Sequence, residues 1–220
     1  MFPHQRLAAW QPPAWTRIFF TGAPGEGKSH LLGAYVRNVY RVAAWDPKCE
    51  HPPTLGGPVL SAQEFFDCSP RLKRGVLRVS VVSRFGPLRD CADPPDPEAI
   101  AEDFDLYARG CWRAGALLAL VEEISTTGAE ANSTPVPLAM LANFGRDTRF
   151  VSLAITAQVA SQLPAKLRAQ ASEWCAFRVS REEDAKTLAT TFRGGADPMK
   201  LRKHQFVHWT PSTGPVTRGP

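Results

Sequence analysis

Residues 16–29 read TRIFFTGAPGEGKS, and this stretch decides the fold. Its first six residues are mostly apolar or β-branched, which predicts a short buried strand. Residues 22–29 fit the pattern G-x-x-x-x-G-K-[ST] in full, and a helix is expected over 28–41. In this arrangement backbone N–H groups and a helix N-terminus face one anion. The stretch therefore predicts a P-loop nucleotide site in an α/β protein.

Two side chains of this loop have expected roles in binding ATP. Lys28 should reach the β- and γ-phosphates, and the Ser29 hydroxyl should bind Mg²⁺. The residues expected to line the nucleotide are Gly22, Ala23, Pro24, Gly25, Glu26, Gly27, Lys28, Ser29 and His30.

A second chemical signal follows the most apolar strand that the sequence predicts. Residues 116–121 read ALLALV, and Glu122 and Glu123 come next. If this strand lies beside the P-loop strand, the first carboxylate can hold Mg²⁺ through water, and the second can polarise the attacking water. We expect Glu122 as the magnesium ligand and Glu123 as the base. Aspartate is commoner at the first position, and two exposed acids at a strand end are the alternative.

Polar and basic residues flank the strand expected over 150–156. Gln158 follows it and could hydrogen-bond the γ-phosphate or the attacking water. Arg146 and Arg149 precede it, and an arginine supplied across a subunit boundary can stabilise transition-state charge. For each arginine, a surface ion pair or a DNA contact is the alternative. Further candidates for the same role are Arg178 and Arg181.

Strands and helices alternate along the rest of the chain. Such alternation predicts a mainly parallel sheet covered by helices on both faces. Residues 1–15, with three prolines, predict an N-terminal arm, and residues 16–220 predict one domain. The other expected strands are 42–45, 75–83, 174–179 and 205–209, and the other helices are 97–112, 138–144, 164–171 and 182–192.

Charge is distributed unevenly along the 220 residues. Residues 1–140 carry 14 Lys and Arg against 15 Asp and Glu, whereas residues 141–220 carry 12 against 6. The basic last third could form one face for nucleic acid, or an ordinary solvated surface.

Several classes of protein fit the sequence poorly. The five cysteines form no C-x-x-C, which argues against a disulfide framework or a zinc site. His204 and His208 were expected on one strand, too far apart to share a metal. No apolar run approaches the roughly 20 residues of a membrane span, and no secretory signal is readable, so a cytoplasmic location is expected.

The order of these motifs resembles the FtsK/HerA branch of P-loop ATPases. The resemblance rests on GAPGEGKS at 22–29, VAAWDPKCE at 42–50 and LLALVEE at 117–123, and most specifically on residues 143–188. It extends over about residues 16–192. Within this branch the chain is similar to the genome-packaging ATPases of tailless, membrane-containing icosahedral viruses.

This resemblance implies a RecA-like (ASCE) core that uses ATP and Mg²⁺ to pump double-stranded DNA through a homo-oligomeric ring, commonly a hexamer. It also implies Arg146 or Arg149 as the arginine acting in trans and Gln158 as the sensor. The expected location is the host cytoplasm or a packaging vertex of the virion, with a capsid or membrane protein as docking partner. Candidate DNA contacts are Lys166 and Arg168, or Arg71, Lys73 and Arg74, and for this second cluster a solvated turn is the alternative.

Two alternatives stay open. One is a P-loop ATPase of filamentous-phage assembly or protein export, whose load is protein. The other is a small-molecule phosphotransferase, which would need an arginine-rich lid and is expected to lack the pair Glu122 and Glu123.

Overall fold

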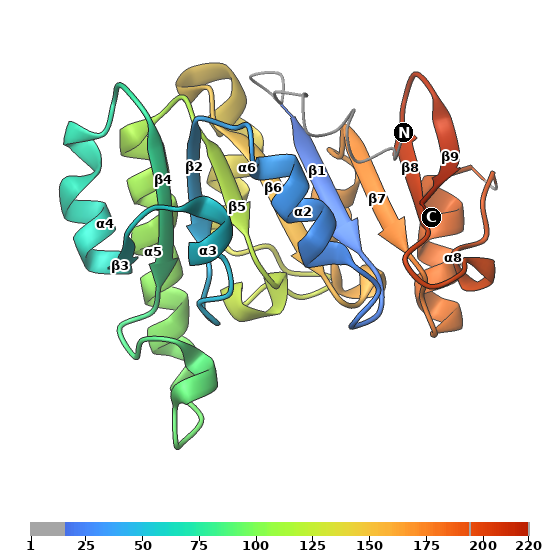
Figure 1. Ribbon diagram of the computed structural model, residues 1–220, viewed down its shortest axis with the longest axis horizontal. Helices are drawn as coiled ribbons and strands as arrows, with labels where there is room; N and C mark the ends of the chain where they lie inside the picture. Colours follow the sequence, from blue (N-terminus) through green and yellow to red (C-terminus); the bar gives the residue numbers. More distant parts are fainter. Residues whose placement is uncertain (1–15, 194, 220) are drawn as a thin grey trace.

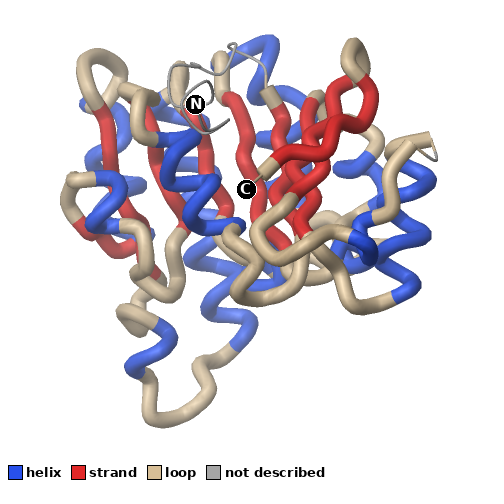
Figure 2. Tube along the Cα trace, turned by 45° about the vertical axis from the view of Figure 1, so that its right-hand side comes forward, coloured by secondary structure: helices blue, strands red, loops and turns tan. Residues whose placement is uncertain are grey.

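The computed structural model describes residues 16–193 and 195–219, apart from the side chains of Arg89, Arg146 and Asp147. The expected N-terminal arm, residues 1–15, lies outside the described residues. Nine strands form one sheet with helices on both faces, which confirms the predicted α/β fold with a mainly parallel sheet (Figures 1 and 2).

The strands are β1 (Arg17–Thr21), β2 (Arg41–Trp45), β3 (Val59–Ser61), β4 (Leu77–Val82), β5 (Leu118–Val121), β6 (Ser152–Ala157), β7 (Glu173–Phe177), β8 (Phe206–Thr210) and β9 (Gly214–Arg218). The α-helices are α2 (Lys28–Val36), α3 (Pro52–Leu55), α4 (Ala62–Cys68), α5 (Pro97–Ala114), α6 (Val136–Phe144), α7 (Ala165–Arg168) and α8 (Glu182–Thr191).

The strand order is β3-β4-β2-β5-β6-β1-β7-β8-β9. The strands from β3 to β7 in this order pair in parallel, and β8 and β9 are antiparallel. The expectation that the acidic strand lies beside the P-loop strand is wrong, because β6 separates β5 from β1. This order places the end of β6 between the P-loop and the acidic pair, at one edge of the sheet.

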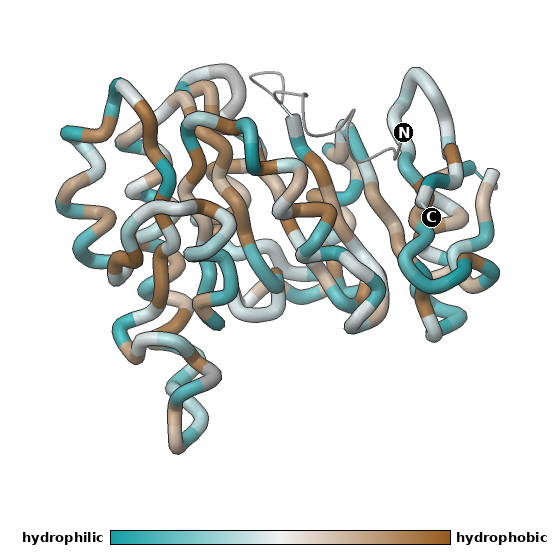
Figure 3. The backbone as a smooth tube through the Cα atoms, viewed as in Figure 1, coloured by the Kyte–Doolittle hydropathy of each residue, from teal (hydrophilic) through white to brown (hydrophobic). Residues whose placement is uncertain are grey.

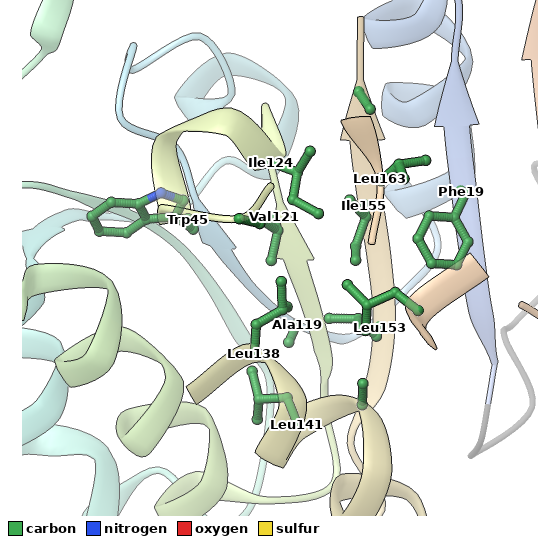
Figure 4. Packing of buried hydrophobic residues seen from close by; sticks show 14 of the residues in the cluster. Phe19, Trp45, Ala119, Val121, Ile124, Leu138, Leu141, Leu153, Ile155 and Leu163 are labelled. Carbon is green, nitrogen blue, oxygen red and sulfur yellow. The ribbon is translucent and has the colours of Figure 1, made fainter. Parts of the chain in front are cut away.

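Both faces of the central strands are buried, as a parallel sheet under helices requires. Along β1, Phe19 belongs to one cluster with residues of α4, α5, α6 and α8. Ile18 and Phe20 point to the other face, where they pack with α2 and Leu55 of α3. Figure 3 shows the hydrophobic character of these strands, and Figure 4 shows how residues of β1, β2, β5, β6 and α6 meet in the first cluster.

Three differences from the expected elements have local causes. Helix α4 was not predicted, although Ser61 and Glu64 form the capping box that begins it, a signal present in the sequence as SAQE. Strands β3 and β9 lie at the two edges of the sheet and were also missed. β9 contains Pro215, which the sequence alone does not favour in a strand but an edge tolerates.

Candidate nucleotide-binding site

The loop between β1 and α2 packs against the end of β7. The N–H of Ala23 donates to the carbonyl of Arg178 over 2.9 Å. Gly22 has φ 139°, and a Cβ added there would lie 2.7 Å from the Cβ of Phe177. The first residue of the loop must therefore be glycine. Gly27, with φ 104°, begins α2, so the helix N-terminus faces the concave side of the loop.

The Lys28 ammonium group holds the loop closed on itself. Its Nζ donates to the carbonyls of Gly22 at 2.7 Å and Ala23 at 3.0 Å. Burial lowers the pKa of Lys28, while the negative charges of Glu123, Glu122 and Glu26 oppose this shift. A partly buried cation in a loop that leads into a helix N-terminus is suited to an anionic ligand such as a phosphate.

A salt bridge ties the middle of the loop to β7. Oε1 of Glu26 accepts from Nε of Arg178 at 3.0 Å and from Nη2 at 2.6 Å. The Glu26 side chain is 4% exposed and that of Arg178 is 45% exposed. Arg178 thus holds the loop at Ala23 through its carbonyl and at Glu26 through its guanidinium. To act on a neighbouring subunit, as predicted, Arg178 would have to release this contact with Glu26 of its own chain.

Glu122 lies at the carboxyl end of β5 and is buried. Its N–H donates to the carbonyl of Trp45 at the end of β2. Oε2 of Glu122 is 3.1 Å from Nε2 of His51, without the geometry of a good hydrogen bond, and the contact is an ion pair when the imidazole is protonated. Sequence reasoning missed His51, since no pattern links it to Glu122 across 71 residues.

Glu123 adopts a left-handed backbone conformation, with φ 57° and ψ 87°. Such a conformation is uncommon for a residue other than glycine and is often found at functional sites. Its N–H donates to Oγ1 of Thr156 on β6 over 2.8 Å, and its Oε1 accepts from the Ser125 hydroxyl. The hydrogen bond to Thr156 fixes the backbone turn at Glu123, and this turn sets the directions of the Glu122 and Glu123 side chains.

Gln158 is exposed and directly follows β6, the strand between β1 and β5. Because carboxyl ends of parallel strands share one edge, the P-loop, Gln158 and the acidic pair are brought to the same edge of the sheet. Ser29 and His30 are exposed at the first turn of α2.

The other arginine candidates lie elsewhere. Arg149 donates to the carbonyls of Trp112 at 2.7 Å and Arg113 at 2.9 Å, and its carbonyl accepts from Ala116, just before β5. It therefore lies at the amino edge of the sheet, opposite its own P-loop. The side chain of Arg146 is outside the described part. Their proposed action in trans stays a prediction.

A pocket of about 400 Å³ opens beside the P-loop. Aromatic rings of Phe177 and Phe206 pack 5.2 Å apart at this place. His204, which sequence reasoning set aside, precedes β8 and has Nδ1 3.3 Å from the carbonyl oxygen of Glu26. Although Phe177 and Phe206 are only 2% and 1% exposed, the lining of the pocket is mostly apolar, which suits a planar ring next to the phosphates. The lining residues are Glu26, Gly27, His30, Leu31, Phe177, His204 and Phe206.

The donor set suits magnesium that arrives with a nucleotide. Within the part of the chain that the structure describes, no group of three or more His, Cys, Asp or Glu could hold a metal alone. Mg²⁺ commonly takes only one or two protein ligands, with phosphates and water supplying the others. The hydroxyl of Ser29 and the buried carboxylate of Glu122, whose Oε2 contacts His51, fit that pattern.

Comparisons by sequence find no relatives: no protein-family model and no curated protein matches the chain. Solved structures do match. The genome packaging NTPase B204 from Sulfolobus turreted icosahedral virus 2, in complex with AMP, matches with TM-score 0.71 at 13% identity, over 95% of this chain and 99% of that one. The fold of this chain is therefore similar to that of this NTPase.

This P-loop fold also matches VirB4 of Thermoanaerobacter pseudethanolicus, with TM-score 0.68 at 10% identity, over 96% of this chain and 91% of that one. Among the described residues, no helix has the length and apolar character needed to cross a membrane.

Proposed function

We propose that this chain is a Mg²⁺-dependent ATPase that translocates double-stranded DNA and packages a viral genome into a preformed capsid. One observation carries the ATPase: the P-loop, the acidic pair and Gln158 follow β1, β5 and β6, at one edge of the sheet. The matching B204 structures, described as a genome packaging NTPase, include complexes with AMPPCP and ATP-gammaS. The description of B204 as a genome packaging NTPase supports our proposal that this ATPase moves double-stranded DNA.

In the proposed reaction the loop N–H groups bind the phosphates, and Lys28 exchanges the Gly22 and Ala23 carbonyls for the β- and γ-phosphates. Ser29 and Glu122 would hold Mg²⁺, which neutralises developing phosphate charge when bound. Glu123 accepts a proton from the attacking water, and Gln158 orients that water. The pocket lined by Phe177, Phe206 and His204 takes the base.

The nucleotide assignment is tested by binding and phosphate release. Lys28→Ala removes the partly buried cation of the loop, and one lost charge-assisted contact is worth about 1.5–3 kcal/mol. We therefore expect affinity for ATP to fall by roughly 10–100-fold, measured by calorimetry. Lys73→Ala, at an exposed lysine after α4, is the control and should bind as the wild type does. Unchanged affinity in Lys28→Ala would remove the P-loop assignment.

The DNA assignment is supported by the basic last third of the chain. A motor that moves along any sequence must grip phosphates rather than base edges. Exposed basic residues available for this are Lys166, Arg181, Lys186, Arg193, Lys200, Arg202 and Lys203, besides Arg71, Lys73 and Arg74.

Binding to double-stranded DNA should be independent of sequence and should weaken steeply between about 50 and 200 mM salt. Fluorescence anisotropy with two unrelated duplexes measures both properties. Absence of DNA binding at low salt would favour a protein load, as in phage assembly or export. Phosphate transfer to a small molecule in place of release would favour a phosphotransferase.

The motor is proposed to work as a homo-oligomeric ring, with a hexamer favoured, in which Arg146 or Arg149 completes a neighbour's site. Head-to-tail contacts generate such rings when the rotation closes. Arg149 supports this assignment by position, since it lies at the sheet edge opposite its own P-loop. The proposed location is the host cytoplasm or a packaging vertex, with a capsid or membrane protein as docking partner.

A further inference from the structure

His51 is a buried histidine next to the acidic pair. It immediately precedes α3 and is 3% exposed. Its Nε2 lies 3.1 Å from Oε2 of Glu122. Glu122 is 7% exposed. Glu122 directly follows β5, and His51 lies in the loop between the neighbouring strand β2 and helix α3. Burying two ionisable groups costs free energy unless they compensate each other. The buried contact between His51 and Glu122 therefore calls for an explanation.

The backbone around His51 is fixed by a second buried acid. Asp46 follows β2 and is 0% exposed. Its Oδ2 accepts from the N–H of His51 at 2.9 Å, and its Oδ1 accepts from the N–H of Glu50 at 2.9 Å. The N–H of Asp46 donates in turn to the carbonyl of Val81 on β4. The imidazole is therefore presented to Glu122 from a loop with little freedom.

Without His51 as its partner, Glu122 could pair with Lys28 of the P-loop instead. Lys28 feels the charges of Glu122 and Glu123, and a direct pair between Lys28 and Glu122 would block the space for phosphate. In the structure Lys28 binds the carbonyls of Gly22 and Ala23, while Glu122 contacts His51. The cation and the carboxylate are thus kept apart, each by its own partner.

We propose that His51 is a positioning residue that holds Glu122 in the orientation in which its carboxylate meets the magnesium of a bound nucleotide. The inference rests on the proposed function and deepens it. Groups that orient a metal-binding side chain typically contribute 10–100-fold to metal affinity or activity. His51 should act on the magnesium dependence of nucleotide binding, and not on nucleotide binding as such.

The chain offers a matched control in a second buried pair. Nε2 of His208 on β8 lies 2.6 Å from Oε1 of Glu173, which begins β7. Glu173 is at the amino end of its strand, and the P-loop follows the carboxyl end of β1 beside it. His208→Ala therefore breaks a similar pair without touching the phosphate site.

The experiment measures binding of AMPPCP by calorimetry while Mg²⁺ is varied, with a further measurement in excess EDTA. In His51→Ala, the Mg²⁺ concentration needed for half-maximal tight binding should rise about tenfold or more, and affinity in EDTA should equal that of the wild type. His51→Gln, which keeps a side-chain donor, should recover part of the shift. His208→Ala should keep the wild-type magnesium dependence.

Four results would overturn the inference: wild-type magnesium dependence in His51→Ala, an equal loss of affinity with and without Mg²⁺, no recovery in His51→Gln, or the same shift in His208→Ala. If circular dichroism shows that His51→Ala is unfolded, His51→Gln decides alone, with an expected shift of about threefold or more and none in EDTA. Failure of the wild type to bind AMPPCP would instead contradict the proposed function itself.

Discussion

At the scale of single residues, Glu123 combines an unusual backbone with a specific anchor. Its φ of 57° places the carboxylate out of line with the strand, and Thr156 holds its N–H. Local strain of this kind costs of order 1–3 kcal/mol and persists when the surroundings impose it. We infer that this turn allows the two acids to take separate roles, with Glu122 at the magnesium and Glu123 at the attacking water.

Glu123→Gln should bind ATP as the wild type does and lose hydrolysis by about 100-fold or more, because a general base contributes 10²–10⁴-fold to the rate. Phosphate release and calorimetric binding measure the two quantities separately. The control is Glu130→Gln, an exposed acid on the loop that follows. Retained turnover in Glu123→Gln would show that another group accepts the proton.

The Arg178–Glu26 salt bridge carries a second residue-scale prediction. Arg178→Ala leaves the buried Glu26 carboxylate without its partner, and we expect the free energy of unfolding to fall by about 1–2 kcal/mol, since the half-exposed guanidinium is partly screened. ATP affinity should fall several-fold because the loop loses its side-chain attachment at Glu26 and keeps only the backbone contact between Ala23 and residue 178. Urea unfolding and calorimetry measure these changes.

The control for this pair is Lys186→Ala, which removes an exposed i,i+4 pair with Glu182 at 3.9 Å and should cost at most about 0.5 kcal/mol. An Arg178→Ala variant as stable as that control would contradict the proposed attachment. If its nucleotide binding is intact and only hydrolysis is lost, Arg178 acts across a subunit boundary instead.

Candidate site residues could be proposed from the sequence only where they lie close together in the chain. The residues from Gly22 to Ser29 are contiguous, so a pattern could identify them. The contacts of His51 with Glu122 and of His204 with the P-loop join segments 71 and 178 residues apart. Only the pairing of β2 with β5 and of β7 with β8 creates these neighbours, and no spacing in the chain encodes them.

At the scale of elements, the packing of α4 on α5 depends on one small residue. Gly110 lies inside α5, and a Cβ added there would be 2.7 Å from Cδ1 and Cε1 of Phe65 on α4. Phe65 is 0% exposed, so its ring can move away only by displacing other core side chains. A glycine in mid-helix is unfavourable by about 1 kcal/mol relative to alanine. The close approach of Phe65 explains why glycine is nevertheless found at position 110.

Gly110→Ala should therefore destabilise the protein, although alanine favours a helix, because overpacking costs about 1–3 kcal/mol. Urea unfolding should show a net loss of up to about 2 kcal/mol. Adding Phe65→Leu to the same chain should recover part of this loss by making room for the methyl group. A Gly110→Ala variant more stable than the wild type would contradict the packing.

Most elements were predictable because their hydrophobic patterns are strong. The expected strands of the parallel core agree with β1, β2, β4, β5, β6 and β7 to within about two residues, a usual uncertainty for element ends. Helix α7 was expected over 164–171 but is only Ala165–Arg168. The strand order could not be predicted, because the sequence gives no sign that β6 inserts between β1 and β5.

At the scale of the whole molecule, the sheet order explains how one edge gathers the proposed chemistry. β1 lies between β6 and β7, and chain segments after all three contribute to the P-loop surroundings. Open parallel sheets bind ligands outside the carboxyl ends of their strands. Arg149, at the amino edge with its guanidinium bound to the carbonyls of Trp112 and Arg113, is instead proposed to act on another molecule. The account therefore requires that hydrolysis depend on association.

The most direct test of the account is the rate of ATP hydrolysis by the full chain, with and without long double-stranded DNA, over a range of protein concentrations. We predict that turnover per chain rises with DNA and rises with protein concentration, because a neighbour completes each site and DNA is the load. Turnover that is indifferent to both would contradict a DNA-translocating ring.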